Sequence, residues 1–124
     1  MRPAIIFLFA ACGIAQAQPD LRLWDASFLT LTAAHSLDLQ SSWGNWANRE
    51  RSPLLRGPDG RFSPQRAVPI KAAVLAGSFF LQRYSARRSR PLRIVFTVVN
   101  FGSAAYIGSV AARNYQVRRS YVLL

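Results

Sequence analysis

Residues 67–84 read AVPIKAAVLAGSFFLQRY and residues 92–112 read LRIVFTVVNFGSAAYIGSVAA, and these two apolar stretches dominate the chain. A helix rises about 1.5 Å per residue, so about 17–25 mostly apolar residues cross the hydrocarbon core of a bilayer, which is ~30 Å thick. Both stretches reach this length, and arginines follow both of them. The sequence therefore predicts a hairpin of two membrane-spanning helices.

The composition also favours a membrane protein. The chain has 124 residues, 51% of them apolar, and a net charge of +11 that comes from 16 basic and five acidic residues. The arginines stand at the ends of the apolar stretches, where charged residues flank a span, and no zinc-finger, RNA-recognition or helix-turn-helix pattern accompanies them. We expect the lipid bilayer as the partner, joined by another membrane protein or a second copy of the chain, and no nucleic acid.

The N-terminus has the features of a signal peptide over residues 1–17. Arg2 supplies the positive charge, AIIFLFAACGIA forms a short apolar core, and Ala15-Gln16-Ala17 matches the small-x-small cleavage pattern. An uncleaved anchor helix is one alternative, and a lipoprotein signal that ends at Cys12 is another. Cys12 is the only cysteine, so no disulfide forms within the chain.

The expected fold is all-α, with three helices at about residues 24–43, 66–86 and 91–114. They belong to one helical membrane domain over residues 18–124. The loop over residues 44–66 is marked by turn-forming Gly, Pro, Asn and Ser residues.

The first of these helices is the most polar. It is just long enough to cross a bilayer, but it carries Asp25, His35 and Asp38. An aspartate at mid-bilayer costs about 2.5–3.5 kcal/mol on insertion scales. The helix therefore either crosses with help from the hairpin or lies half-buried against it. Trp24 and Trp43 bracket the helix and are expected to anchor it at the two membrane interfaces.

The distribution of arginines predicts an orientation. If all three helices cross and the mature N-terminus lies outside, eight arginines fall on the cytoplasmic side and six on the outer side. If only the hairpin crosses, five lie inside and nine outside. Positive residues accumulate on the cytoplasmic side of membrane proteins. The sequence therefore favours three spans in the inner (cytoplasmic) membrane, with a periplasmic mature N-terminus.

Small residues recur every four positions in the two hairpin helices. They are Ala73 and Gly77 in the first and Ala104, Gly108 and Ala112 in the second. Because small side chains let helix backbones approach closely in a bilayer, we expect the hairpin helices to pack through these faces.

Polar residues within or beside the expected helices are the candidate functional residues. They are Asp38, Glu50, Lys71 and Asn100. Asn100 lies in the middle of its stretch and is expected to hydrogen-bond to a neighbouring helix, with ligand binding as the alternative. Lys71 either extends toward the loop or pairs with Asp38 or Glu50. His35 lies three residues before Asp38 on the same helical face and is a candidate proton relay.

Enzymatic function is not expected from these residue types. The chain has one histidine and five acids, and it lacks a Ser–His–Asp arrangement or a glycine loop that could hold phosphate. A metal site needs three or more ligands. We therefore expect no catalytic residues, no metal and no cofactor.

Several short motifs follow one another along the chain. They are Asp38 with Ser41 and Ser42, then Glu50-Arg51-Ser52-Pro53-Leu54-Leu55, then Lys71, Asn100 and Arg113-Asn114. In this order they resemble a group of small, uncharacterised bacterial multi-helix membrane proteins. That group has an Asp followed by Ser or Thr in its first helix, a Glu-x-Asn-Pro-Leu signature in the loop, and a Lys at the start of its second helix. Ser52 stands where the group has Asn. The resemblance implies a helical membrane protein whose four candidate residues form one polar cluster.

Three functions are compatible with the sequence. The first is a non-enzymatic integral membrane protein with a structural or interaction role. The second is a small transport or proton-relay component that uses an intramembrane Asp/Glu/Lys cluster. The third is a secreted cationic protein that binds anionic lipid through its arginines.

Overall fold

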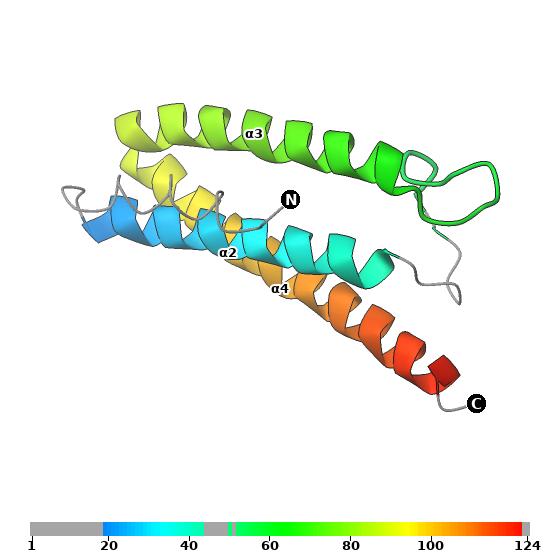
Figure 1. Ribbon diagram of the computed structural model, residues 1–124. Helices are drawn as coiled ribbons and strands as arrows, with labels where there is room; N and C mark the ends of the chain where they lie inside the picture. The colour runs from blue at the N-terminus through cyan, green and yellow to red at the C-terminus, as the bar shows by residue number, and fades with distance from the viewer. Residues whose placement is uncertain (1–18, 44–49, 51, 123–124) are drawn as a thin grey trace.

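The computed structural model describes residues 19–43, 50 and 52–122, and this part of the chain is built from three helices (Figure 1). They are α2 (Pro19–Ser42), α3 (Pro64–Arg88) and α4 (Arg90–Val122). The predicted all-α class is confirmed, although α2 begins earlier and α4 ends later than expected. The predicted signal peptide and Cys12 lie outside the described residues.

A single residue, Ser89, separates α3 from α4. Its backbone is extended, with φ −134° and ψ 115°, and its N–H donates to the carbonyl oxygen of Ser85 at 3.0 Å. Its hydroxyl oxygen accepts the N–H of Leu92 in the first turn of α4 at 3.4 Å. Pro91 is also tolerated there, because N–H groups in the first turn lack helical partners. Ser89 therefore ends one helix and caps the next.

The three helices lie side by side, with α2 and α4 running in the same direction and α3 returning in the opposite one (Figure 1). Helix α4 packs chiefly against α2, and α3 makes far fewer contacts with either. The main packing interaction therefore joins the two helices that are farthest apart in the sequence.

The contact between α2 and α4 repeats every seven residues. We call it the α2–α4 seam, and its small buried members are Ser27, Ala34 and Ser41 on α2 and Thr97, Ala104 and Ala111 on α4. Asn100 Nδ2 donates to Ser27 Oγ at 3.1 Å, and Asn114 Nδ2 donates to Ser41 Oγ at 3.2 Å. Both bonds join residues 73 positions apart, so one register holds over two heptads, about 21 Å of helix. This is the repeat of a parallel, left-handed coiled coil.

The seam corrects the predicted packing of the hairpin helices. Ala73 and Gly77 of α3 are exposed, whereas Ala104 of α4 is buried in a core built mainly from α2. Helix α3 instead turns Leu75 and Phe79 toward that core. Helix α4 packs on α2 because both carry small residues at the same seven-residue spacing, which allows close approach over a long distance.

Trp24 is also placed differently from the prediction. It is 1% exposed, and its ring centroid lies 6.0 Å from that of Phe28 and 5.9 Å from that of Phe79. Its indole N–H donates to Gln82 Oε1 at 3.1 Å, which satisfies the polar atom inside the bundle. Trp24 is thus a core residue and no interface anchor, while Trp43 at the other end of α2 is exposed.

The described part of the loop forms a compact turn before α3. Gly57 N–H donates to the Arg61 carbonyl oxygen at 2.8 Å, and Ser63 N–H donates to that of Leu55 at 2.9 Å. Gly60 has φ +76°, a conformation that glycine adopts without strain. These hydrogen bonds fix the path of the backbone into the first turn of α3.

Within the described residues, one helix is long and apolar enough to cross a membrane, namely Arg90–Arg119 of α4. Only 22% of the residues in the 18-residue apolar segment of this helix are buried. Neither the spanning stretch that we expected at residues 67–84 nor the span that we favoured at about residues 24–43 meets this criterion, because charged and polar residues lower their hydropathy.

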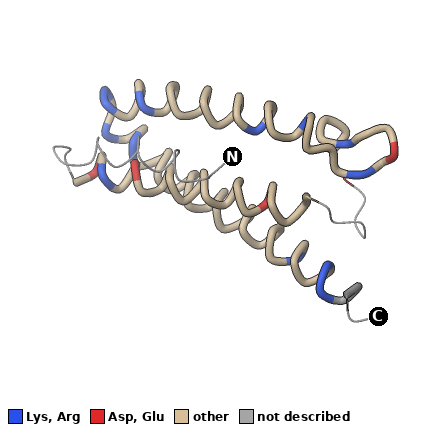
Figure 2. The backbone as a smooth tube through the Cα atoms, in the orientation of Figure 1, with Lys and Arg blue, Asp and Glu red and all other residues tan. Residues whose placement is uncertain are grey.

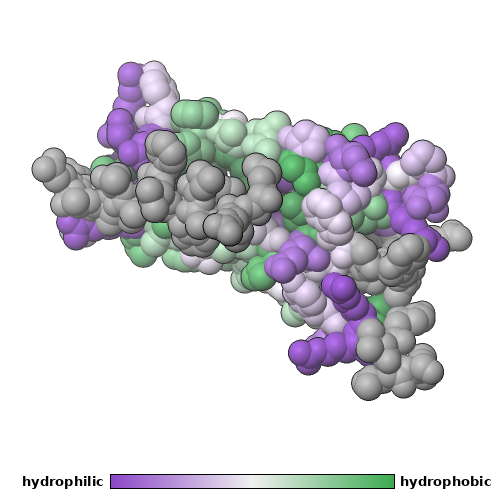
Figure 3. Space-filling view, in the orientation of Figure 1, coloured by the Kyte–Doolittle hydropathy of each residue, from purple (hydrophilic) through white to green (hydrophobic). Residues whose placement is uncertain are grey.

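Charge and hydropathy are separated along the bundle. Basic residues gather at the end where α3 meets α4 and at the opposite end, which carries the loop and the end of α4 (Figure 2). Between them, the face in view in Figure 3 is hydrophobic along the middle of α3 and hydrophilic at both ends. This face of the bundle thus has an apolar middle between two hydrophilic ends.

The seam makes a matched pair of substitutions informative. Ala34→Leu should lower the free energy of unfolding by about 1–3 kcal/mol, because an isobutyl group cannot fit where the two backbones approach. Ala33→Leu, on the exposed face of the same helix, should change it by less than ~0.5 kcal/mol. Unfolding of the purified protein in detergent micelles measures both, and equal effects would contradict the seam.

Candidate functional site

Buried polar side chains form two networks that connect the helices. The Asn100 network consists of Trp24, Ser27, Gln82 and Asn100. The Asp38 network consists of Asp38, Ser41, Ser42, Lys71 and Asn114. Each network contains residues from all three helices.

The Asn100 network is centred on a pair of side-chain amides. Asn100 is 1% exposed, and its Nδ2 donates to Ser27 Oγ at 3.1 Å and to Gln82 Oε1 at 2.9 Å. Gln82 Nε2 donates in return to Asn100 Oδ1 at 3.1 Å. The Ser27 hydroxyl donates to the carbonyl oxygen of Trp24 at 2.7 Å. The prediction that Asn100 hydrogen-bonds to a neighbouring helix is confirmed, and the neighbours are both α2 and α3.

This network has the properties of a structural clamp. Both donors of Asn100 are used within it, and it contains no acidic or basic side chain. A buried polar group costs free energy unless it is hydrogen-bonded, so pairing makes the amides a constraint on helix position. The bonds favour helix association and offer no chemistry of their own.

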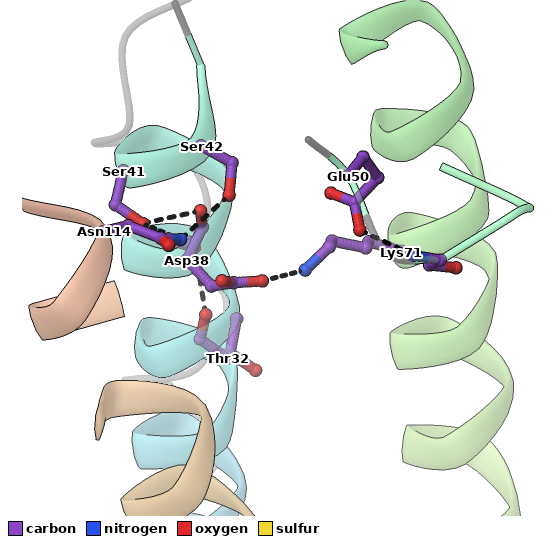
Figure 4. A network of polar contacts seen from close by, with 9 residues as sticks. Thr32, Asp38, Ser41, Ser42, Glu50, Lys71 and Asn114 are labelled. Carbon is purple, nitrogen blue, oxygen red and sulfur yellow. Dashed lines mark hydrogen bonds and ion pairs between the residues drawn. The ribbon is translucent and has the colours of Figure 1, made fainter. Parts of the chain in front are cut away.

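The Asp38 network contains an ion pair. Lys71 Nζ of α3 reaches across to Asp38 Oδ2 of α2 at 2.5 Å (Figure 4). The two side chains are 14% and 18% exposed. On the other side of α2, Asn114 of α4 donates to Ser41 Oγ and Ser42 Oγ, each at 3.2 Å. Of the alternatives left open for Lys71, the structure selects the ion pair, and its acid is Asp38.

Glu50 has a local role in the loop. Its carboxylate accepts the backbone N–H of Ser52 at 2.9 Å, and its carbonyl oxygen accepts Arg56 Nε at 2.9 Å. These bonds hold the loop before α3. Among the described residues, Glu50 forms no ion pair with Lys71.

His35 lies on α2 close to the Asp38 network. Its Nδ1 is buried and has no hydrogen-bond partner in the described part of the chain. A relay needs a hydrogen-bonded path for the proton, and the buried nitrogen of His35 does not supply one in this arrangement.

The single polar cluster of Asp38, Glu50, Lys71 and Asn100 is therefore divided. Asp38 and Lys71 meet, but Asn100 bonds to α2 at Ser27, about three helical turns and about 16 Å away from Asp38 along the helix. The register of α4 on α2 sets this separation.

Two further ion pairs lie near the start of α2. Asp25 Oδ1 is 3.3 Å from Arg83 Nη1, and Asp20 Oδ2 is 3.1 Å from Arg90 Nε. The Arg83 guanidinium also lies 5.5 Å from the Phe79 ring centroid, within the range of a cation–π contact. Every acidic residue of α2 is thus paired with a basic residue of α3 or α4.

Sequence reasoning missed Ser27 and Gln82 as functional positions, and it noted Asn114 without a partner. One pattern could have revealed them: Asn100 and Asn114 are separated by two heptads, as are Ser27 and Ser41. Equal spacing of hydrogen-bonding residues on two helices is the pattern of a shared register.

The described residues offer no group of three His, Cys, Asp or Glu side chains that could hold a metal ion.

Comparison of the chain with protein-family models, curated proteins and solved structures found no match.

The Lys71–Asp38 pair predicts different effects for single and double substitutions. Lys71→Met should lower the free energy of unfolding by about 3 kcal/mol, because it leaves a largely buried carboxylate without its counter-charge. Asp38→Leu combined with Lys71→Met should recover most of this loss. Unfolding of the three proteins in detergent micelles measures the coupling.

Asp20→Asn is the matched control for that experiment. It removes the acid of the Asp20–Arg90 pair, whose side chains are 42% and 73% exposed, so its effect should stay below ~1 kcal/mol. A double variant no more stable than Lys71→Met would refute the ion-pair interpretation.

Proposed function

We propose that the protein is a small, non-enzymatic integral membrane protein whose three helices cross the inner membrane together and serve a structural or interaction role. The observation that carries the proposal is the inverted distribution of side chains. Ser27, Ser41 and Asn100 are among the most deeply buried residues, while large apolar residues cover the outside. The most exposed of these are Leu54, Phe80, Leu81, Val98 and Tyr106.

Helix α4 supports this proposal most directly. Its apolar window is long enough to cross a bilayer and is mostly unburied. The core helix of a soluble protein would be covered by its neighbours. Contiguous apolar surface on a monomer marks a contact with a membrane or another protein, and here it extends to α3.

Helices α2 and α3 can cross beside α4 because their charges are paired. Asp38 meets Lys71, and Asp25 meets Arg83. Charged residues within membrane segments face the bundle interior and pair with one another, since an isolated charge in hydrocarbon is costly. The proposal also places the mature N-terminus in the periplasm. It further assigns the protein to the group of small bacterial membrane proteins that the sequence motifs resemble.

The non-enzymatic role rests on how the polar groups are used. The Asn100 network is occupied by its own hydrogen bonds, and Asp38 and Lys71 neutralise each other. What the bundle offers to a partner is its apolar outer surface. Another membrane protein or a second copy of the chain fits that chemistry.

Extraction of membranes tests the central proposal. The full chain should stay in the membrane pellet after washing with alkaline carbonate and with high salt, because its apolar surface is in contact with lipid. A secreted cationic protein held by arginines alone would be released by salt, since salt screens exposed charges. N-terminal sequencing of the same preparation reports whether residues 1–17 have been removed.

A proton-relay or transport component is the second candidate. It is favoured by the Lys71–Asp38 pair, which lies within the helical bundle. This function predicts a pH-dependent flux in liposomes that Asp38→Asn abolishes and Asp20→Asn preserves. Flux no greater than that of empty vesicles would eliminate it.

A further inference from the structure

The end of the bundle where α3 meets α4 is strongly basic. Its arginines are Arg22, Arg83, Arg87, Arg88, Arg90 and Arg93, and its acids are Asp20 and Asp25, all close to the start of α2, the end of α3 or the start of α4. Because α2 and α4 are parallel, both of their N-termini lie at this end, against one C-terminus from α3. Helix N-termini carry partial positive charge, so they add to the field of the arginines.

The contacts at this end leave three arginines available, Arg22 on α2 and the neighbouring Arg87 and Arg88 on α3. Asp25 is paired with Arg83, and Asp20 with Arg90. Arg93 is buried, and its Nε donates to the carbonyl oxygen of Ala86 at 2.9 Å. The neighbouring Arg87 and Arg88 are exposed and form no ion pair with any described residue.

Arg88 ends an exposed stripe along α3. The stripe consists of Val74, Gly77, Leu81, Tyr84 and Arg88, which recur at alternating intervals of three and four residues. Four of its members are uncharged, and the Arg88 guanidinium lies 4.0 Å from the Tyr84 ring centroid. No atom outside the helix lies within contact distance of a side chain built at Gly77, so the stripe is open there. One face of α3 therefore carries an exposed, mostly apolar stripe that ends at a positively charged guanidinium group.

We propose that this surface binds an anionic phospholipid, with the lipid phosphate at Arg87 and Arg88 and an acyl chain along the stripe of α3. A guanidinium matches phosphate with paired hydrogen bonds, and the contact with Tyr84 orients that of Arg88. The apolar track selects a lipid over a soluble phosphate, because only a lipid has a chain to cover it. This inference rests on the proposed function, since the stripe meets lipid only if α3 lies in the membrane.

Lipid binding by the full chain in detergent micelles tests the inference. Phosphatidylglycerol should bind about tenfold more tightly than phosphatidylcholine in a titration followed by native mass spectrometry. Arg87→Gln combined with Arg88→Gln should remove this preference, and the corresponding pair of lysine substitutions should retain most of it. Arg118→Gln combined with Arg119→Gln is the matched control, because it removes the same charge from exposed residues at the other end and should leave the preference unchanged.

Each contrary result has a definite meaning. Equal losses in the two glutamine double variants would overturn the site, because net charge alone would then explain binding. Displacement of phosphatidylglycerol by an equal concentration of inorganic phosphate would overturn the lipid as the source of the phosphate. No preference in a protein that resists carbonate extraction would refute only the lipid site, whereas release by carbonate would refute the membrane function itself.

Discussion

The hydrogen bonds from Asn100 to Ser27 and from Asn114 to Ser41 constrain the rest of the structure. Their equal sequence separation holds α2 and α4 parallel in one register. A parallel pair needs a connection that returns along its whole length, and α3, with 25 residues against the 24 of α2, supplies it. The loop before α3 and the sharp joint at Ser89 follow from that requirement.

In the proposed membrane setting, the forces that hold this bundle together differ from those in a soluble core. Lipid tails are as apolar as leucine, so large apolar side chains gain little by leaving them, and helices associate through close packing and interhelical hydrogen bonds. The seam has this composition, with serine, alanine and threonine where a soluble coiled coil has leucine and isoleucine. The aromatic cluster of Trp24, Phe28 and Phe79 is a large apolar contact, and it brings α3 to the pair near its C-terminal end.

Electrostatics arranges the third helix. The ion pairs of Lys71 with Asp38 and of Arg83 with Asp25 hold α3 to α2 near both of its ends, while the Gln82 amide bonds to Asn100 of α4. Between these points α3 has few close neighbours. A Cβ atom placed at Gly77 would have no atom of another element within 4 Å. A helix attached at its ends leaves its outer face exposed.

The sequence by itself determined the helices, because helix formation depends on local features: apolar runs of sufficient length, Pro64 and Pro91 in first turns, and a break at Ser89. It also identified Asn100 as a residue that needs a partner and Lys71 as one that could pair with Asp38. Only the tertiary structure decided which helices pack together, moved Trp24 into the core, and separated Asn100 from Asp38. The reason is that partner choice depends on the register between segments 73 residues apart, and hydropathy and local spacing carry no information about which of two similar small-residue faces will meet.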